Sequence, residues 1–408
     1  MNIIRPNNKK LEKIYNRGFT RNKRVEEKVR QIIEDVRSFG DDALLKYTRK
    51  FDGVKLSGRQ LKVSEIEISG AYQNITANFV STLKIIIENI NCFYRKTLKK
   101  PWRIKCGEGV VLGENYTPLE RVGIYIPAGT APLASSVYMT VLPAKIAGVK
   151  KIAIISPPDE HGYINPHILV VADLLKVDEI YRVGGAQGIA ALAYGTKTIP
   201  RVDKIVGPGN IYVSEAKRQV FGAVDIDMIA GPTELVIIAN RHSESRFIVA
   251  DIRAQIEHAQ GMALLITNSR SLAKEVKAQT ENVNGFIILT KNLQEAVEIS
   301  NKIAPEHLEI LVRNPNRLLK GVKNAGAIFL GPYSPVAIGD YIAGPSHVLP
   351  TKGTARFFSG LSALDFMKTN HIISYSRRAL EKAKDPLDKI ASIEGLVKHM
   401  ESVKARFS

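Results

Sequence analysis

One stretch of the sequence, residues 121–206, decides the fold class. Its short apolar runs are bounded by Gly, Pro or charged residues, and the longer segments between them carry apolar residues at helical spacing. Strands that alternate with helices in this way predict a parallel sheet. The predicted strands are RVGIYI (121–126), KIAII (151–155), EIYRV (179–183) and KIV (204–206), and the predicted helices are 136–147, 168–175 and 189–194.

A second series with the same texture begins at Glu234. It opens with the strand LVIIA (235–239), and two such series suggest an old duplication, although no clear residue-level repeat is present. We therefore predict an α/β fold with two Rossmann-like, incompletely doubly wound parallel-sheet domains. The series continues through a helix at 247–257, a strand at 262–267 and further segments at 286–289, 293–303, 308–312 and 327–330.

The two ends of the chain have a helical pattern. Residues 1–100 are predicted to be mainly helical, with a turn at FDG (51–53) and a long helix that Pro101 ends. The tail carries a thin apolar stripe and a break at Asp385-Pro386, so it must pack on the body or on a second copy. The predicted divisions are 1–122 (helical segment and start of the first α/β domain), 123–233, 234–370 and a helical tail at 371–408.

The composition is that of a globular protein. A length of 408 residues predicts two or three domains, and 45% apolar with 24% charged residues exclude collagen-like and largely disordered proteins. No run approaches 18 apolar residues, and no apolar segment follows the basic start, so we expect neither a membrane span nor a secretory signal. Two cysteines, Cys92 and Cys106, suit a reducing compartment, and we expect a cytoplasmic protein.

The net charge of +18 raises the question of a nucleic-acid partner. The basic residues alternate with apolar ones at helical spacing, as in residues 25–36, which is typical of the solvated faces of amphipathic helices. No recognised nucleic-acid motif accompanies them, so we predict no nucleic-acid partner. A basic surface also favours the approach of an anionic cofactor.

Two pairs of polar residues are candidates for chemistry in the second series. Gln255 and His258, three residues apart at the end of a predicted helix, share one helical face. Pro305 is expected to begin a helix whose first turn contains Glu306 and His307. There the helix dipole would lower the pKa of His307 and keep it neutral as a general base. A helix-terminal histidine and a first-turn acid are the structural alternatives.

Further polar residues lie nearer the C-terminus. Asp340 is embedded in a stretch dense with Gly and Pro, where Asp also commonly forms turns. Glu394 and His399, five residues apart, do not share one helical face squarely, which favours a solvated helix. Nitrogen and oxygen ligands without sulfur suit zinc, but a spacing over 145 residues makes the metal prediction weak on spacing alone. The candidate ligand set is Gln255, His258, Asp340 and His399.

Two Gly-rich turns each follow a predicted strand and lead into a helix. They are VGGAQG (183–188) and VGPGN (206–210), and their backbone N–H groups could face a phosphate or ribose. Val183 stands where the first Gly of the usual dinucleotide fingerprint is needed. Adjacent turns of this kind describe the crevice of an open sheet, and tight turns without a ligand are the alternative.

Taken in order, these segments resemble histidinol dehydrogenase, the family of NAD-dependent enzymes at the end of histidine biosynthesis. The resemblance runs from the turn at 51–53 to His399. Its most diagnostic part is IDMIAGPTE (226–234) followed by QIEH (255–258). Supporting segments are PLERVGIYIP (118–127), 183–185 with Gln187, GPGN (207–210), APEHL (304–308), GDY (339–341) and SHVLP (346–350).

The resemblance implies one zinc ion per subunit, held by Gln255, His258, Asp340 and His399. In this family zinc orients the substrate rather than acting as the principal Lewis acid. The family's tail crosses to the partner in a homodimer, so Glu394 and His399 would complete the other protomer's site. The implied substrate-binding residues are Thr233, Gln255, His258, Glu306, His307, Asp340, Glu394 and His399.

The resemblance also implies the reaction. L-Histidinol would be oxidised to L-histidine through L-histidinaldehyde, with two NAD consumed. His307 would serve as acid–base catalyst and Glu306 would activate water for the aldehyde step. Domain 123–233 would bind NAD through Tyr125, Gln187 and Asn210, while domain 234–370 would carry the zinc and acid–base residues.

Departures from the family pattern are small. Ala128 stands where many relatives have Gly, and Thr233 replaces a common Ser while keeping the hydroxyl. One rival interpretation is a paralogous zinc- and NAD-dependent dehydrogenase for another amino or sulfo alcohol, against which Glu306 and Glu394 speak. The other rival is a catalytically idle basic binding protein, which the intact acid–base pair and ligand set disfavour.

Overall fold

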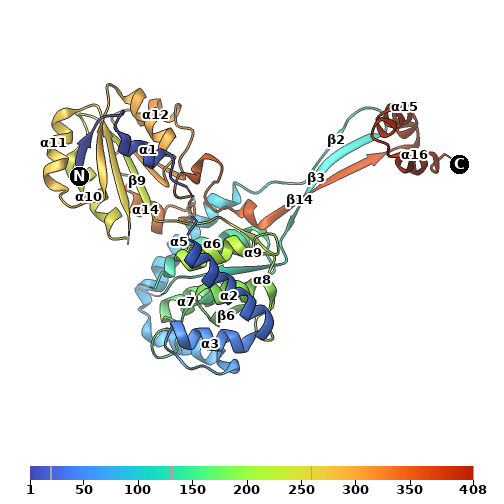
Figure 1. Cartoon of the computed structure of the whole chain (residues 1–408), viewed down its shortest axis with the longest axis horizontal. Helices are drawn as coiled ribbons and strands as arrows, with labels where there is room; N and C mark the ends of the chain where they lie inside the picture. The colour runs from blue at the N-terminus through green and yellow to red at the C-terminus, as the bar shows by residue number, and fades with distance from the viewer. Residues whose placement is uncertain (19–20, 129–131, 259, 408) are drawn as a thin grey trace. The chain divides into compact units, whose positions relative to one another are not determined.

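The computed structural model describes residues 1–18, 21–128, 132–258 and 260–407, which form two compact units. The first unit joins Met1–Thr97 to Leu119–Phe366, and the second joins Leu98–Pro118 to the chain from Met367 onward. The first unit is a mixed α/β structure with two parallel sheets (Figure 1). None of the helices in the described ranges combines the length and apolar character that crossing a membrane requires.

The five-stranded sheet of the first unit forms from the stretch that begins at Arg121. All its neighbouring strands are parallel, in the order β6-β5-β4-β7-β8. The N-terminal helices α2 and α3 pack beside α8 and α9, where Val29 and Ile32 join Ile189 and Val213 in one buried cluster. The strands are β4 (Arg121–Tyr125), β5 (Lys151–Ser156), β6 (Glu179–Arg182), β7 (Lys204–Val206) and β8 (Asp225–Ile226); the helices are α2 (Lys23–Phe39), α3 (Asp41–Phe51), α4 (Glu65–Ala71), α5 (Ala77–Arg95), α6 (Ala134–Ala147), α7 (Pro166–Leu174), α8 (Gly185–Tyr194) and α9 (Ile211–Val220).

The six-stranded sheet is also wholly parallel, in the order β1-β11-β10-β9-β12-β13. Apolar residues of α10 and α11 cover one face, and those of α1 and α12 cover the other. The strands are β1 (Asn2–Ile4), β9 (Glu234–Ala239), β10 (Met262–Thr267), β11 (Gly285–Leu289), β12 (His307–Leu311) and β13 (Ala327–Leu330); the helices are α1 (Lys9–Tyr15), α10 (Ser245–Ile256), α11 (Arg270–Gln279), α12 (Leu293–Ile303), α13 (Pro315–Leu319) and α14 (Val336–Tyr341).

The second unit is an antiparallel three-stranded sheet followed by two helices. Among the described residues of the helical pair, Ala391, Met400 and Val403 form one small buried cluster, against which the partly buried Leu380, Leu387 and Phe407 pack. Ile393 and Val397 remain 75% and 65% exposed, so the pair has an apolar surface of its own. Its elements are β2 (Trp102–Lys105), β3 (Val110–Pro118), β14 (Met367–Tyr375), α15 (Arg377–Ile393) and α16 (Val397–Lys404), with the strand order β14-β3-β2.

Several expectations about the two ends are wrong. The break expected at Asp385-Pro386 does not occur, because α15 runs through the exposed Pro386 and the chain turns instead at Gly395, in the left-handed region (φ +71°). Helix α5 ends at Arg95, before Pro101. Residues 2–4 form β1, which pairs with β11, within the segment expected to be helical, and residues 371–375 of the expected helical tail belong to β14 (Met367–Tyr375).

A buried ion pair fixes the turn that follows β7. The ammonium of Lys217 contacts the carboxylate of Asp227 and donates to the carbonyl of Gly207 (3.0 Å). Asp227 in turn accepts the N–H groups of Gly207 (2.8 Å) and Met228 (2.6 Å). The side chains of Lys217 and Asp227 are 2% and 1% exposed. Helix α9 and the segment after β8 thus hold the turn from both sides.

We expect Gly285→Ala to destabilise the six-stranded sheet. Gly285 has φ +153°, and an added Cβ would lie 1.7 Å from the carbonyl oxygen of its strand partner Ala263. The expected loss is at least about 2 kcal/mol of unfolding free energy in urea. Gly70→Ala in α4 is the matched control, because its Cβ meets nothing within 4 Å. Equal stability of the two variants would contradict the assigned clash.

Lys217→Met should leave the carboxylate of Asp227 buried without its cation. The expected loss is about 3–5 kcal/mol in equilibrium unfolding. The double variant Lys217→Met/Asp227→Asn removes that charge and should recover part of the loss, because the two sites are coupled. Strictly additive effects in the double-mutant cycle would show that the pair does not carry the stability of the turn.

Candidate functional site

A cavity of ≈ 630 Å³ lies at the carboxyl ends of β4, β6 and β7. This is where open α/β sheets bind ligands. The three residues predicted to contact a cofactor, Tyr125, Gln187 and Asn210, all line it, so the structure brings them together. The wall also contains Phe51, Asp52, Pro127, Ala128, Pro157, Gly185, Pro208 and Gly209.

The polar groups of this cavity are held in different ways. The hydroxyl of Tyr125 accepts the N–H of Gly185 (3.4 Å), and burial raises the pKa of Tyr125 to about 12, so the phenol stays neutral. The Gln187 side chain is buried, and neither amide atom has a hydrogen-bond partner within the described ranges. Asn210 caps α9 by accepting the N–H groups of Tyr212 and Val213, which leaves its amide NH₂ available.

Asp52 lines this cavity, although no role was predicted for it from the sequence. The FDG turn indicates only the end of a helix, yet Asp52 lines the cavity just after α3. Its Oδ2 is buried without a hydrogen-bond partner in the part of the chain described. Burial raises the pKa of Asp52 to about 6. A donor from a bound molecule, such as a ribose hydroxyl, would satisfy this oxygen.

A second cavity, of ≈ 560 Å³, contains His307, Asp340 and His347. Nδ1 of His307 lies 3.7 Å from Oε2 of Glu306, and Nε2 lies 3.8 Å from Oδ1 of Asp340. Neither ring nitrogen of His307 has a hydrogen-bond partner among the described residues. The imidazole therefore stands between two carboxyl groups with both nitrogens free for another molecule. Apolar walls come from Phe93, Ile328, Phe329, Ile338, Leu349 and Leu361.

The expected position of Glu306 and His307 in a helical first turn is wrong. Ala304 is left-handed (φ +49°) and ends α12, and His307 is the first residue of β12, where it pairs with Leu235. The pKa of His307 is lowered to about 3, as expected in direction, but the first cause is burial in the sheet and not a helix dipole. The ring is therefore neutral at physiological pH.

The carboxyl of Glu306 is buried, unlike that of an ordinary surface acid. Burial raises the pKa of Glu306 to about 8, and a hydrogen bond with Thr233 opposes the rise. Oε2 of Glu306 also accepts the backbone N–H of Glu234 (3.0 Å). Gln255 extends this chain, since its Nε2 donates to the hydroxyl of Thr233 (3.1 Å). The structure thus links three of the predicted residues by direct hydrogen bonds.

Glu234 supports the same network from the other side. Its Oε1 accepts Nε of Arg17 (2.7 Å) and the backbone N–H of Lys352 (2.9 Å). The carboxylate is 4% exposed, and Arg17 also contacts its second oxygen. Arg17 lies 217 residues earlier in the chain, so no sequence motif indicates this pairing.

His258 lies outside the helix on which it was expected. Helix α10 ends at Ile256, so Gln255 and His258 do not share a continuous helical face. Electrostatic interaction with His258 nonetheless contributes to lowering the pKa of Asp340, His307 and His347. Burial raises the pKa of Asp340 to about 6, and His258 opposes that rise. These residues therefore share one electrostatic environment.

His347 was given no role from the sequence, although it lines the same cavity as His307 and Asp340. Its Nδ1 contacts the carbonyl of Asp340 (2.9 Å) and its Nε2 contacts the hydroxyl of Ser136 (3.2 Å). Burial lowers the pKa of His347 to about 4. The ring connects α6 with the segment after α14 and holds the backbone of Asp340.

The side chains of Gln255, His258 and Asp340 carry nitrogen and oxygen donors of the kinds that bind zinc. Within the described ranges, no group of three or more His, Cys, Asp or Glu side chains could hold a metal by itself. This unit supplies His258 and Asp340, and Gln255 adds an amide oxygen that its bond to Thr233 leaves free. A buried carboxylate whose pKa is raised is stabilised in its charged form by a nearby cation. Nitrogen and oxygen donors of this kind fit zinc.

Glu394 and His399 lie in the second unit. Glu394 follows the end of α15, His399 lies in α16, and both are exposed. They sit on different elements, in agreement with the expectation that they do not share one helical face. Their part in the site stays a prediction.

Comparisons with known proteins agree over nearly the whole chain. The model of the histidinol dehydrogenase family matches residues 15–407. A histidinol dehydrogenase of Listeria innocua is 49% identical over 400 residues, covering 94% of this chain and 93% of the relative. One of Clostridium acetobutylicum is 46% identical, covering 93% and 91%. The crystal structure of histidinol dehydrogenase from Elizabethkingia anophelis matches with a TM-score of 0.94 at 33% identity, covering 100% of this chain and 98% of that one. The chain therefore belongs to the histidinol dehydrogenase family.

Proposed function

We propose that this protein oxidises L-histidinol to L-histidine, through L-histidinaldehyde, with two NAD reduced per product, as the last step of histidine biosynthesis. Membership of the family over the full chain supports the reaction. The observation that carries it is the buried pair Glu306 and His307, whose pKa values burial shifts in opposite directions and whose imidazole lines a cavity.

His307 is the acid–base catalyst in this proposal. Hydride loss from the alcohol carbon to NAD⁺ requires removal of the hydroxyl proton, and a neutral imidazole can accept it. The lowered pKa of His307 keeps the ring neutral and able to accept a hydrogen bond from the substrate hydroxyl, although it also makes the imidazole a weak base until the bound substrate changes its surroundings. Both ring nitrogens lack a hydrogen-bond partner in the described structure. The first step then yields aldehyde, NADH and a proton.

Glu306 activates water for the second oxidation. Water adds to the aldehyde carbon to form the hydrate, which loses hydride to a second NAD⁺ and becomes the carboxylate. A base with a pKa near the working pH combines an adequate ionised fraction with a useful proton affinity. Glu306, with a pKa of about 8, meets that condition. Thr233 and the Glu234 amide fix its orientation.

NAD occupies the cavity that contains Tyr125, Gln187 and Asn210 in this proposal, within a Rossmann-like domain. The free amide of Gln187 and the NH₂ of Asn210 can bond ribose and phosphate oxygens. The Gly185 N–H already points at the Tyr125 hydroxyl, so the turn after β6 is held close to β4. Ala128 adds a methyl group to this wall, with a small expected effect on cofactor affinity.

Zinc would be held by Gln255, His258 and Asp340 together with His399 of the partner subunit. When bound, the ion holds the imidazole and amino groups of the substrate and so orients the reacting carbon. Glu394 of the partner subunit would contact the same substrate. The proposal therefore includes a homodimer in which each α15–α16 tail completes the other protomer's site.

The primary test is NADH formation from L-histidinol by the purified protein before and after treatment with a chelator. We expect two NADH per histidinol consumed, loss of turnover on chelation and recovery with Zn²⁺. Small sulfonated diols serve as the comparison substrates. No NADH from histidinol in the zinc-loaded protein, or faster turnover of a sulfonated diol, would reject the proposed substrate.

Substitutions at the acid–base pair should separate the two oxidations. His307→Asn should lower kcat for both histidinol and histidinaldehyde by about 10²–10⁴-fold, since both steps need proton removal. Glu306→Gln keeps the shape and should mainly slow the aldehyde step. Single-turnover measurements with each substrate provide the readout. A Glu306→Gln enzyme impaired only with histidinol would reverse the assigned roles.

Mixing two inactive variants tests the shared site. Asp340→Asn removes a ligand from the body, and His399→Asn removes one from the tail. If tails cross, a mixed dimer has one site with both lesions and one with neither, so random pairing restores about a quarter of the wild-type activity. Co-expression with two different affinity tags isolates the mixed dimer. Absence of any recovery in that dimer would mean that each tail serves its own protomer.

A further inference from the structure

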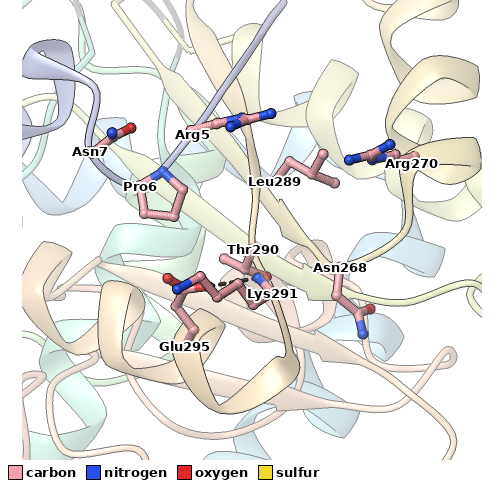
Figure 2. A pocket seen from close by; sticks show the side chains of 9 residues that line it. All are labelled: Arg5, Pro6, Asn7, Asn268, Arg270, Leu289, Thr290, Lys291 and Glu295. Atoms are coloured by element: carbon pink, nitrogen blue, oxygen red, sulfur yellow. Dashed lines mark hydrogen bonds between the residues drawn. The ribbon is translucent and has the colours of Figure 1, made fainter.

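A third cavity lies at the carboxyl ends of β1, β10 and β11, away from every residue assigned above. Its volume is ≈ 480 Å³, within the range of small-molecule sites. It shares no lining residue with the cavities proposed for cofactor and substrate. Figure 2 shows its side chains around the space where the three strands end. The inference below does not depend on the proposed reaction.

Three cations come to this cavity from three separate segments. Arg5 follows β1, Arg270 opens α11 after β10, and Lys291 follows β11. No ion pair involves any of these side chains within the residues that the structure describes. All three residues are exposed, so solvent screens their mutual repulsion, and an anion bound in the cavity would be attracted by all three.

The single acid in the wall is already engaged. Oε2 of Glu295 accepts the backbone N–H of Lys291 (2.6 Å), the dashed contact in Figure 2. The side chains of Arg5, Arg270, Lys291 and Glu295 therefore leave a formal surplus of two positive charges. That surplus matches the charge of a phosphate monoester dianion.

A buried hydroxyl adds a directional donor. Thr290 is 6% exposed, lines the cavity, and its Oγ1 has no hydrogen-bond partner in the described part of the chain. A buried polar atom of this kind is uncommon and calls for a partner. Helices α11 and α12, of 10 and 11 residues, also begin at this edge, and their positive ends favour an anion.

We propose that this cavity binds the phosphate group of a small molecule. Arg5 and Arg270 offer planar guanidinium groups for paired hydrogen bonds to phosphate oxygens, and Lys291 adds a point charge. The hydroxyl of Thr290 donates to a further oxygen. The volume exceeds that of a free phosphate ion, and Pro6 and Leu289 supply apolar surface, so a phosphate monoester of sugar size is the expected ligand class.

The test uses ³¹P NMR line broadening with the full-length protein, saturated with NAD so that the cofactor cavity is filled. Ribose 5-phosphate and inorganic phosphate are titrated separately. We expect saturable broadening with both, and tighter binding of the ester. Preference for inorganic phosphate would identify the free ion as the ligand and overturn the ester assignment. No saturable broadening with either probe would overturn the site.

Variants localise the binding. Arg5→Gln/Arg270→Gln should weaken ribose 5-phosphate binding by about tenfold or more, since charge-assisted hydrogen bonds are lost. Thr290→Val should weaken it less, while keeping the side-chain shape. Lys274→Gln/Arg313→Gln is the charge-matched control at exposed positions outside all three cavities and should bind like wild type. If the Arg5→Gln/Arg270→Gln variant bound ribose 5-phosphate as tightly as wild type, or if the control lost as much affinity as that variant, the binding would be nonspecific charge attraction and the proposed site would be wrong.

Discussion

The burial of Glu306 and His307 away from bulk solvent is the constraint on which the candidate chemistry depends. In water the first would be charged and the second would titrate near neutrality. Burial at the start of β12 instead raises one pKa and lowers the other. Both changes follow from one cause, because desolvation penalises whichever form carries charge. The parallel register of β12 with β9 and β13 keeps the pair in this environment.

A hydrogen-bonded frame gives that environment its geometry. Arg17 neutralises Glu234, whose backbone N–H is donated to Glu306, and Thr233 joins Glu306 to Gln255. The frame therefore draws on the N-terminal region, β9 and α10 at once. Loss of one member of such a network lowers the stability of the fold, because its neighbour stays buried without a hydrogen-bond partner. It also means that residues distant in sequence position the groups that touch the substrate in the proposed reaction.

The strands that are apolar on both faces could be predicted from the sequence, and those that are exposed could not. Runs such as 262–267 and 327–330 match β10 and β13 residue for residue, whereas Trp102–Lys105 is exposed at every position and offers no alternation of burial. The Gly-rich turns at 183–188 and 206–210 could be predicted to border one crevice because parallel strands end at one edge, whereas the position of Tyr125 was implied only by the family resemblance. Glu306 and His307 were identified as candidates, but their secondary structure was predicted wrongly. Pro305 is as compatible with the start of a helix as with the start of the strand β12. Arg17 and His347 hold Glu234 and Asp340 through tertiary contacts, and such contacts leave no local pattern in the sequence.

The small helical core of the second unit has a consequence for handling the enzyme. The four buried side chains described in these helices, three of them in one cluster, cannot by themselves offset the ordering of two helices, and Ile393 and Val397 are exposed. Stability of this unit must come from whatever covers those side chains, and in the proposed homodimer that is a second copy. Dilution would dissociate the two copies and so destabilise the folded tail. Inactivation at low enzyme concentration, reversed on reconcentrating, would be a property of the assembly rather than damage to the protein.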